Sequence, residues 1–289
     1  MSKSVGNVLD PTELVTLYGV DNVRYFLASE FHFGNDGDFS HEAFCHRINL
    51  NLANDLGNLA QRVLTMVNRN CNGQIPQPGE LNEEDLAMLR AVEDSLAEVR
   101  AHLEVQAVKS ICDAVIQVAK LGNRYFDSQA PWLLVKSDPA RLQTVLYVLA
   151  ELLRHSAILL QPVMPQSCDA MLDQLGIPSD PLSRNFAALS SKIVPGTKIM
   201  LPRPVFPKLE VPVIPTKGTP VVETAQSKEV AARLAHYDTL SAADITAKIA
   251  EVGMVIRAKK LEKVSKEELK PLLLELTHLK NRYAMAYVH

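Results

Sequence analysis

The chain has 289 residues, of which 47% are hydrophobic and 22% are charged, and its formal net charge is −3. This composition is typical of globular proteins; it excludes a chain that is disordered throughout and predicts two or three compact units. The longest central apolar run, residues 145–150, is soon followed by charged residues, so we expect no membrane span and no membrane partner.

The cysteines indicate a reducing compartment. Cys45, Cys71, Cys112 and Cys168 stand far apart and include no CxxC pair, so we predict neither a metal site nor a disulfide framework. The first residues lack the apolar segment behind a basic end that a secretory signal carries. We therefore predict a cytoplasmic protein and leave an organelle open.

Helices are predicted along most of the first 190 residues. Asp10 followed by Pro11 indicates the capped start of a short helix that runs to Tyr18. Residues 41–70 form a long predicted helix, because apolar residues recur there at spacings of three and four. Further helices are predicted at 83–104, at 106–128, at 139–161 and after Pro165. Long helices joined by short breaks predict an all-α fold, an antiparallel helical bundle.

Prolines mark the end of the predicted bundle. Seven of the seventeen lie between residues 195 and 220, a stretch that helix cannot cross. We predict an extended linker there, and its apolar anchors would be Ile199, Leu201, Val205 and Phe206.

A C-terminal helical hairpin is predicted after the linker, with helices at 241–258 and 265–285. Ser265 to Glu268 would open the second helix as a capping box. Residues 241–289 carry nine Lys and Arg against six acids, which suggests a polyanionic partner.

A polar stripe is predicted along the helix at 41–70. Four asparagines fall within ten residues: Asn49, Asn51, Asn54 and Asn58. Each costs up to ~0.7 kcal/mol against alanine in a helix interior, so compensating contacts are expected. Asn51, Asp55, Asn58 and Arg62 follow one another at spacings that place them on one face. These amides either cap neighbouring helices or face water, or together with the guanidinium they form a rigid row of donors that reads the base edges of a nucleic acid.

Trp132 is the only tryptophan, and it follows Pro131 at a predicted break between two helices. Proline fixes the backbone there and favours a ring presented at a helix start. The indole is either a core anchor or, if exposed, a stacking platform for an unpaired base.

Lysines provide two more candidate contacts with phosphate. Lys3 lies between two hydroxyls in MSKS, which is either a solvated loop or a mobile carrier of an ammonium group to a polyphosphate. The lysines of the C-terminal hairpin are either a solvated face or a weak, salt-sensitive contact with a phosphate backbone.

Over about residues 1–210, these segments resemble the methionyl-tRNA synthetase family. MSKSVGN resembles the KMSKS signature of class I aminoacyl-tRNA synthetases without its leading lysine, and residues 24–40 resemble the connecting element that follows it. NLANDLGNLAQR and NRYFDSQAPW are similar to two helix segments of the anticodon-binding bundle. PGTKIMLPRPVFPKLE is similar to the strand-forming coda of the core enzyme.

This resemblance implies roles for particular residues. Asn58, Arg62 and Trp132 would contact the CAU anticodon of tRNA-Met, and the tryptophan would stack on the wobble cytosine. The ATP-binding loop would comprise Met1, Ser2, Lys3 and Ser4, and Lys3 would act in catalysis by stabilising the leaving pyrophosphate. The complete enzyme would use ATP with Mg²⁺, and no metal ligand is implied in this chain.

From about residue 241 the chain resembles the WHEP domain, a helical hairpin appended to several synthetases. The resemblance implies nonspecific tRNA contacts by Arg257, Lys260, Lys263 and Lys266, or else a protein partner. Lys259 departs from the pattern, since the family favours leucine there.

The expected organisation has four parts: residues 1–40 with the KMSKS loop and connecting element, 41–190 as the anticodon-binding bundle, 191–226 as the linker, and 227–289 as the WHEP-like hairpin. The sequence contains no HxGH string. We therefore expect the nucleotide-binding half to be a missing partner, and this chain alone to bind no ATP and to be inactive. The expected function is that of the C-terminal part of a methionine-tRNA ligase; the alternatives are a free-standing tRNA-binding or assembly module and, last, a structural scaffold.

Overall fold

The computed structural model describes residues 10–31, 39–212, 237, 242–261, 272, 275, 276 and 279. It divides into two compact units, Met1–Pro212 and Val213–His289. Across the described residues every regular element is a helix, and the one β-bridge, between Gln74 and Lys198, is isolated. The predicted all-α fold is confirmed.

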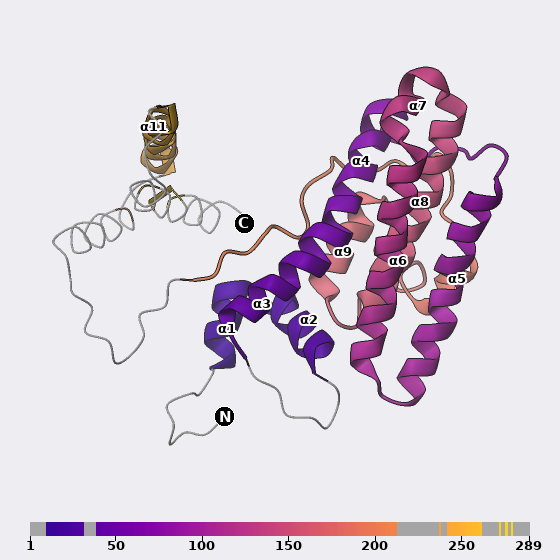
Figure 1. Cartoon of the computed structure of the whole chain (residues 1–289), viewed down its shortest axis with the longest axis horizontal. Coiled ribbons are helices and arrows are strands. Elements are labelled where there is room, and N and C mark those ends of the chain that lie inside the picture. Colours follow the sequence, from indigo (N-terminus) through magenta and orange to yellow (C-terminus); the bar gives the residue numbers. More distant parts are fainter. Residues whose placement is uncertain are drawn as a thin grey trace. The chain divides into compact units, whose positions relative to one another are not determined.

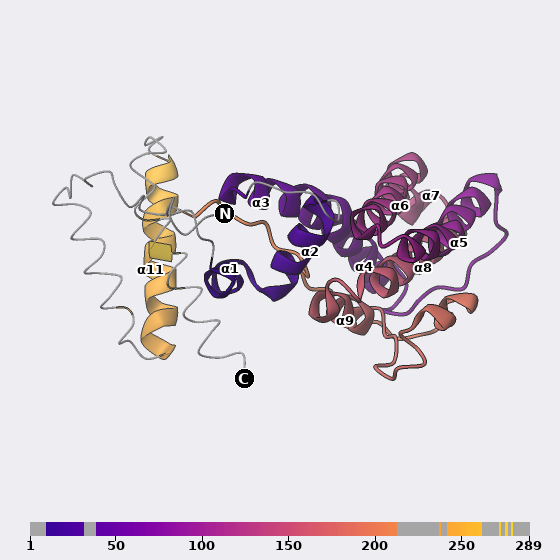
Figure 2. The same cartoon turned by 90° about the horizontal axis from the view of Figure 1, so that it is seen from below.

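The first unit is a helical bundle preceded by two short helices (Figure 1). Its elements are α1 (Pro11–Tyr18), α2 (Val20–Glu30), α3 (His41–Ile48), the π-helix η2 (Asn49–Gly57), α4 (Asn58–Asn70), α5 (Glu83–Glu104), α6 (Val108–Gln129), α7 (Pro131–Ser137), α8 (Pro139–Leu160), α9 (Pro165–Gln174) and the 3₁₀-helix η3 (Phe186–Ser190). In Figures 1 and 2, α5, α6 and α8 run side by side.

Side-chain caps fix where several helices begin. Asp10 accepts a hydrogen bond from the Thr12 amide, and Asp138 accepts one from the Arg141 amide. Each cap is followed by a proline at the first helical position, where no amide hydrogen is needed. At α5, Asn82 and Asp85 form a reciprocal capping box.

The helix predicted at 41–70 is helical throughout, but its central segment η2 is π-helical. A wider helical turn changes which side chains face the core. Asn51 is only 4% exposed, and its amide donates to the Tyr25 hydroxyl over 3.0 Å. Asn51 therefore neither caps a helix, faces water nor is open to a base, and all three expectations for the stripe are wrong at this residue.

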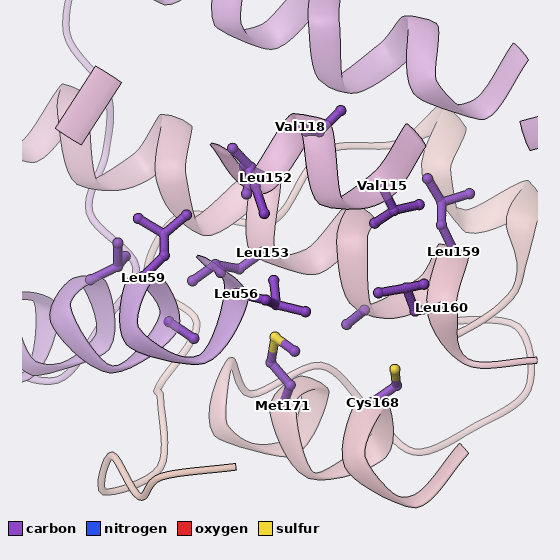
Figure 3. Packing of buried hydrophobic residues seen from close by; sticks show 14 of the residues in the cluster. Leu56, Leu59, Val115, Val118, Leu152, Leu153, Leu159, Leu160, Cys168 and Met171 are labelled. Carbon is purple, nitrogen blue, oxygen red and sulfur yellow. The ribbon is translucent and has the colours of Figure 1, made fainter. Parts of the chain in front are cut away.

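Helix α8 forms the centre of the core. By length and composition alone it is apolar enough to cross a membrane, but 94% of its apolar window is buried inside the bundle. Figure 3 shows Leu152, Leu153, Leu159 and Leu160 among side chains from η2, α4, α6 and α9. Gly122 of α6 allows the close packing there, since a Cβ would lie 2.5 Å from Leu152 Cδ1.

A buried ion-pair network joins three helices. The Arg141 guanidinium of α8 binds both carboxylate oxygens of Asp85 on α5, at 2.5 and 2.7 Å. Tyr125 of α6 also donates to Asp85. Burial raises the pKa of Asp85, but the hydrogen bonds from Arg141 and Tyr125 outweigh it and the pKa is lowered overall.

Residues 191–212 are extended and lie against the bundle. Ile193, Ile199 and Phe206 are buried, whereas Leu201 is 68% exposed and so is not the predicted anchor. The coda predicted as strand-forming makes only the isolated bridge at Lys198, because its prolines supply no amide hydrogens for a ladder.

The described part of the second unit contains α11 (Ala242–Leu261), at the place of the first predicted hairpin helix. Ile245, Val252 and Ile256 pack with Tyr237 and Leu279 in a small apolar cluster. Most of the helix predicted at 265–285 lies outside the described residues.

Candidate functional site

Asn58 and Arg62 lie on one face of α4. Asn58 is its first residue and is exposed, and the Arg62 side chain, one turn later, is 31% exposed. Residues four apart in a helix are neighbours on its surface. Both side chains are therefore presented together, as predicted from their spacing.

The Arg62 guanidinium is fixed by two consecutive residues of α6. Its Nη2 donates to Asp127 Oδ1 over 2.7 Å, and its Cζ lies 4.0 Å from the centroid of the Phe126 ring. The ion pair and the cation–π contact restrict the orientation of this group. Arg62 thus needs little further ordering when it meets a ligand.

The Trp132 ring packs against the Phe126 ring, which also contacts Arg62. Its ring centroid is 5.9 Å from that of Phe126 at an interplanar angle of 34°, and the residue is 51% exposed. Ala130 adopts a left-handed conformation and Pro131 opens α7, which turns the next residue outward. Trp132 stands at a helix start, as predicted, and is not a core anchor. We call Asn58, Arg62, Phe126, Asp127 and Trp132 the α4–α7 surface.

Two further contacts attach α6 to η2 beside this surface. The Asn123 amide donates to the Asp55 carbonyl oxygen over 2.7 Å, and the Lys120 ammonium lies 4.0 Å from the Asp55 carboxylate. Burial raises the pKa of Asp55, and Lys120 partly offsets that shift. These contacts hold α6 in register with the helix that carries Asn58.

The groups of the α4–α7 surface are suited to binding a ligand. It offers an amide, a fixed guanidinium, and an exposed aromatic face. Unstacked bases are recognised in this way, by stacking on aromatic rings and by hydrogen bonds to their edges. Among the described residues no group of three or more His, Cys, Asp or Glu is placed to hold a metal ion.

The four asparagines have different surroundings. Asn49 exchanges two hydrogen bonds with the Leu209 backbone, at 2.7 and 2.8 Å, and Asn51 binds Tyr25. Asn54 and Asn58 are exposed. The first two are therefore bound inside the unit, although neither caps a helix or faces water as expected, and only the last two are available to a ligand.

Phe126 and Asp127 were not predicted as site residues. They lie within NRYFDSQAPW, so their closeness to Trp132 in the sequence was visible. The sequence did not indicate that Arg62, more than 60 residues earlier, would contact the Phe126 ring.

Several predicted site residues are not placed. Met1, Ser2, Lys3 and Ser4 lie outside the described residues, as do Lys263 and Lys266. Arg257 is exposed on α11, and the side chain of Lys260 is not described.

Two family models match the chain. Residues 1–64 match the class I tRNA synthetases (M), and residues 75–213 match the anticodon binding domain of methionyl tRNA ligase.

Relatives that align with most of this chain are named as methionine-tRNA ligases. A protein named Methionine--tRNA ligase from Brucella suis biovar 1 (strain 1330) is 51% identical over 209 residues, which are 72% of this chain and 40% of that protein. One of the same name from Mycobacterium bovis (strain ATCC BAA-935 / AF2122/97) is 47% identical over 216 residues, 73% of this chain and 41% of that protein. The chain thus spans about two fifths of the length of these relatives.

A solved structure agrees with these matches. Mycobacterium tuberculosis methionyl-tRNA synthetase in complex with methionyl-adenylate is similar with a TM-score of 0.69 and 47% identity, over 72% of this chain and 41% of that one. Over residues 1–64 and 75–213, the chain therefore belongs to the methionyl-tRNA synthetase family.

Proposed function

We propose that this chain is the part of a methionine-tRNA ligase that recognises the CAU anticodon of tRNA-Met. The observation that carries the proposal is the half-exposed Trp132 ring, which shares Phe126 with the fixed Arg62 guanidinium. The match of residues 75–213 to the anticodon binding domain of methionyl tRNA ligase supports it.

Three residues of the surface contact bases in this proposal. Trp132 stacks on the wobble cytosine, while Asn58 and Arg62 donate hydrogen bonds to base edges. Base–aromatic stacking is worth ~1–3 kcal/mol per base. The anticodon loop provides unpaired bases that can reach such a surface.

The activity of the complete enzyme is part of the same proposal. It attaches methionine to tRNA-Met with ATP and Mg²⁺, and a solved relative is described as a complex with methionyl-adenylate. Lys3, in the loop Met1–Ser4, would stabilise the leaving pyrophosphate. Since the 289 residues contain no HxGH string, we expect no aminoacylation by this polypeptide alone.

The C-terminal unit is proposed to assist binding. Arg257, Lys260, Lys263 and Lys266 would contact tRNA without sequence preference, or the unit would hold a protein partner. The cytoplasm is the proposed location, with an organelle as the alternative.

Filter binding of RNA hairpins tests the anticodon proposal. We expect the chain to retain a hairpin with a CAU loop better than the same hairpin with uridine in place of the cytosine. Trp132→Ala should weaken CAU binding by roughly 5-fold to 150-fold, the equivalent of one lost stacking contact. Trp132→Phe keeps an aromatic face and should lose less. Equal retention of both hairpins by the unaltered chain would overturn the proposal.

A free-standing tRNA-binding or assembly module is the second candidate, favoured by the basic composition of residues 241–289. In that case deletion of residues 227–289 should abolish RNA binding. If the chain reads the anticodon, the shortened protein should bind more weakly and still prefer CAU.

A further inference from the structure

We infer that Arg69, Arg124 and Lys136 bind phosphates of the RNA whose bases contact the α4–α7 surface. The inference rests on the proposed function and adds a second class of contact to it. The three cations come from three helices, and each is exposed.

Arg69 follows Arg62 by seven residues on α4. That spacing is close to two helical turns, so both side chains project from the same face of the helix. At 1.5 Å per residue, Arg69 lies about 10 Å further along the helix axis. It therefore extends the Asn58–Arg62 face away from Asn58.

Arg124 belongs to a stripe on α6 with Lys120, Asn123 and Asp127, whose spacings of three and four place them on one helix face. The other three members contact η2 or α4: Lys120 and Asn123 through Asp55, and Asp127 through Arg62. Arg124 lies at the exposed side of this stripe, beside the groups that hold Arg62.

Lys136 follows Trp132 by four residues on α7. The two therefore lie one above the other on that short helix, and both are exposed. Asp138, the acid nearest to Lys136 in the sequence, already accepts the Arg141 amide at the start of α8. The indole and the ammonium are thus offered to a ligand side by side.

These three cations differ from Arg62 and Lys120 in their ion pairing. The charge of Arg62 is balanced by Asp127, and that of Lys120 by Asp55. Within the part of the chain that the structure describes, Arg69, Arg124 and Lys136 form no ion pair. The net positive charge therefore comes from Arg69, Arg124 and Lys136. The Arg62–Asp127 pair among the proposed base-contacting residues adds none.

This arrangement suits two kinds of RNA contact. Phosphate contacts position a nucleic acid and give affinity that falls with salt, whereas base contacts provide sequence preference. A guanidinium already held by a carboxylate and a ring is suited to a base edge. Unpaired, exposed cations are suited to phosphates, since their binding releases the counterions that are condensed on the RNA.

Fluorescence anisotropy with the full chain and a CAU-loop RNA hairpin, titrated with KCl, tests the inference. Arg69→Gln, Arg124→Gln and Lys136→Gln should each reduce the slope of log affinity against log salt by about 0.7 to 0.9, and the triple variant by about 2.1 to 2.7. The preference for CAU over a uridine-substituted loop should stay unchanged in all of them. Arg62→Gln should lose that preference.

Arg100→Gln is the matched control, because Arg100 is exposed near the C-terminal end of α5 and away from this surface. Far-ultraviolet circular dichroism of each variant checks that the helices remain. A triple variant with the same salt slope as Arg100→Gln would overturn the inference. An unaltered chain that shows no CAU preference would instead overturn the proposed function, and the salt slopes would still decide the phosphate contacts.

Discussion

At the scale of single residues, Asp127 forms an ion pair with Arg62 and balances its charge. Its carboxylate lies 2.7 Å from the guanidinium and is itself 62% exposed. We expect Asp127→Asn to free the charge of Arg62 for phosphates of any RNA. Affinity for hairpins with substituted loops should rise, CAU preference should shrink, and the salt slope should steepen by about 1, all measurable by anisotropy.

Asp113→Asn is the control for this change, since Asp113 is also on α6 and pairs with Lys109 at 2.7 Å. If both variants change RNA binding alike, the effect comes from the charge of the helix and not from Arg62.

Gly176 is a position at which a side chain would clash with the backbone of the extended segment. Its φ is +74°, and a Cβ would lie 2.3 Å from the backbone oxygen of Lys198. Gly196 has a φ of +85° with nothing within 4 Å of a Cβ. We expect Gly196→Ala to lower the unfolding free energy by about 1–2 kcal/mol through the left-handed backbone alone. Gly176→Ala should cost clearly more in urea unfolding, because residues 197–198 must move. Equal losses would show that the close approach is unimportant.

At the scale of elements, Glu151 fixes the extended segment to α8. Its carboxylate accepts hydrogen bonds from Arg154 on α8 and from the Ile193 amide, at 2.6 to 3.0 Å, and lies 3.2 Å from His155 Nε2. Burial raises the pKa of Glu151, but His155 and Arg154 more than compensate and hold it at about 2. A carboxylate with a lowered pKa in the folded state stabilises the fold above its unfolded pKa, about 4.3, and this contribution is lost as pH falls toward 2.

Glu151→Gln should therefore reduce the unfolding free energy at pH 7 and flatten its decline between roughly pH 5 and pH 2. Chemical unfolding followed by circular dichroism at a series of pH values measures both effects. Glu93→Gln is the control, because the Glu93–Lys192 pair is about half exposed and such pairs contribute little. An unchanged acid limb in Glu151→Gln would show that another carboxylate dominates it.

The same elements show what could be predicted from the sequence. The starts of α5 and α8 were predicted correctly, and at both a capping side chain acts locally, joined by a proline at α8. The π-helical turn of η2 was not, since the apolar spacing continues through it while the backbone bonding changes. Asn58, Arg62 and Trp132 could be selected as candidates from the sequence, and their contact with bases stays a prediction. Phe126 and Asp127 could not, because their contact with Arg62 depends on which helices pack together. No local pattern encodes that choice.

At the scale of the whole first unit, α2 connects the two regions that match different family models. Arg24 donates to the carbonyl oxygens of Pro162 and Val163, both at 2.8 Å, just after α8 ends. Asp21 accepts a hydrogen bond from the Ser167 amide in the first turn of α9, over 2.6 Å. One short helix thus binds the turn between α8 and α9 and caps the start of α9.

We expect Arg24→Ala to loosen α2 without unfolding the bundle, because two charge-assisted hydrogen bonds are lost while the core side chains stay in place. Each such bond is worth about 1.5–3 kcal/mol, so amides of α1 and α2 should exchange with deuterium about tenfold faster or more. Amides in the centres of α5, α6 and α8 should keep their protection. Arg90→Ala, at an exposed position of α5, should change neither region. Faster exchange throughout α8 in Arg24→Ala would show that this contact stabilises the whole bundle, and that α2 is not a separate attachment.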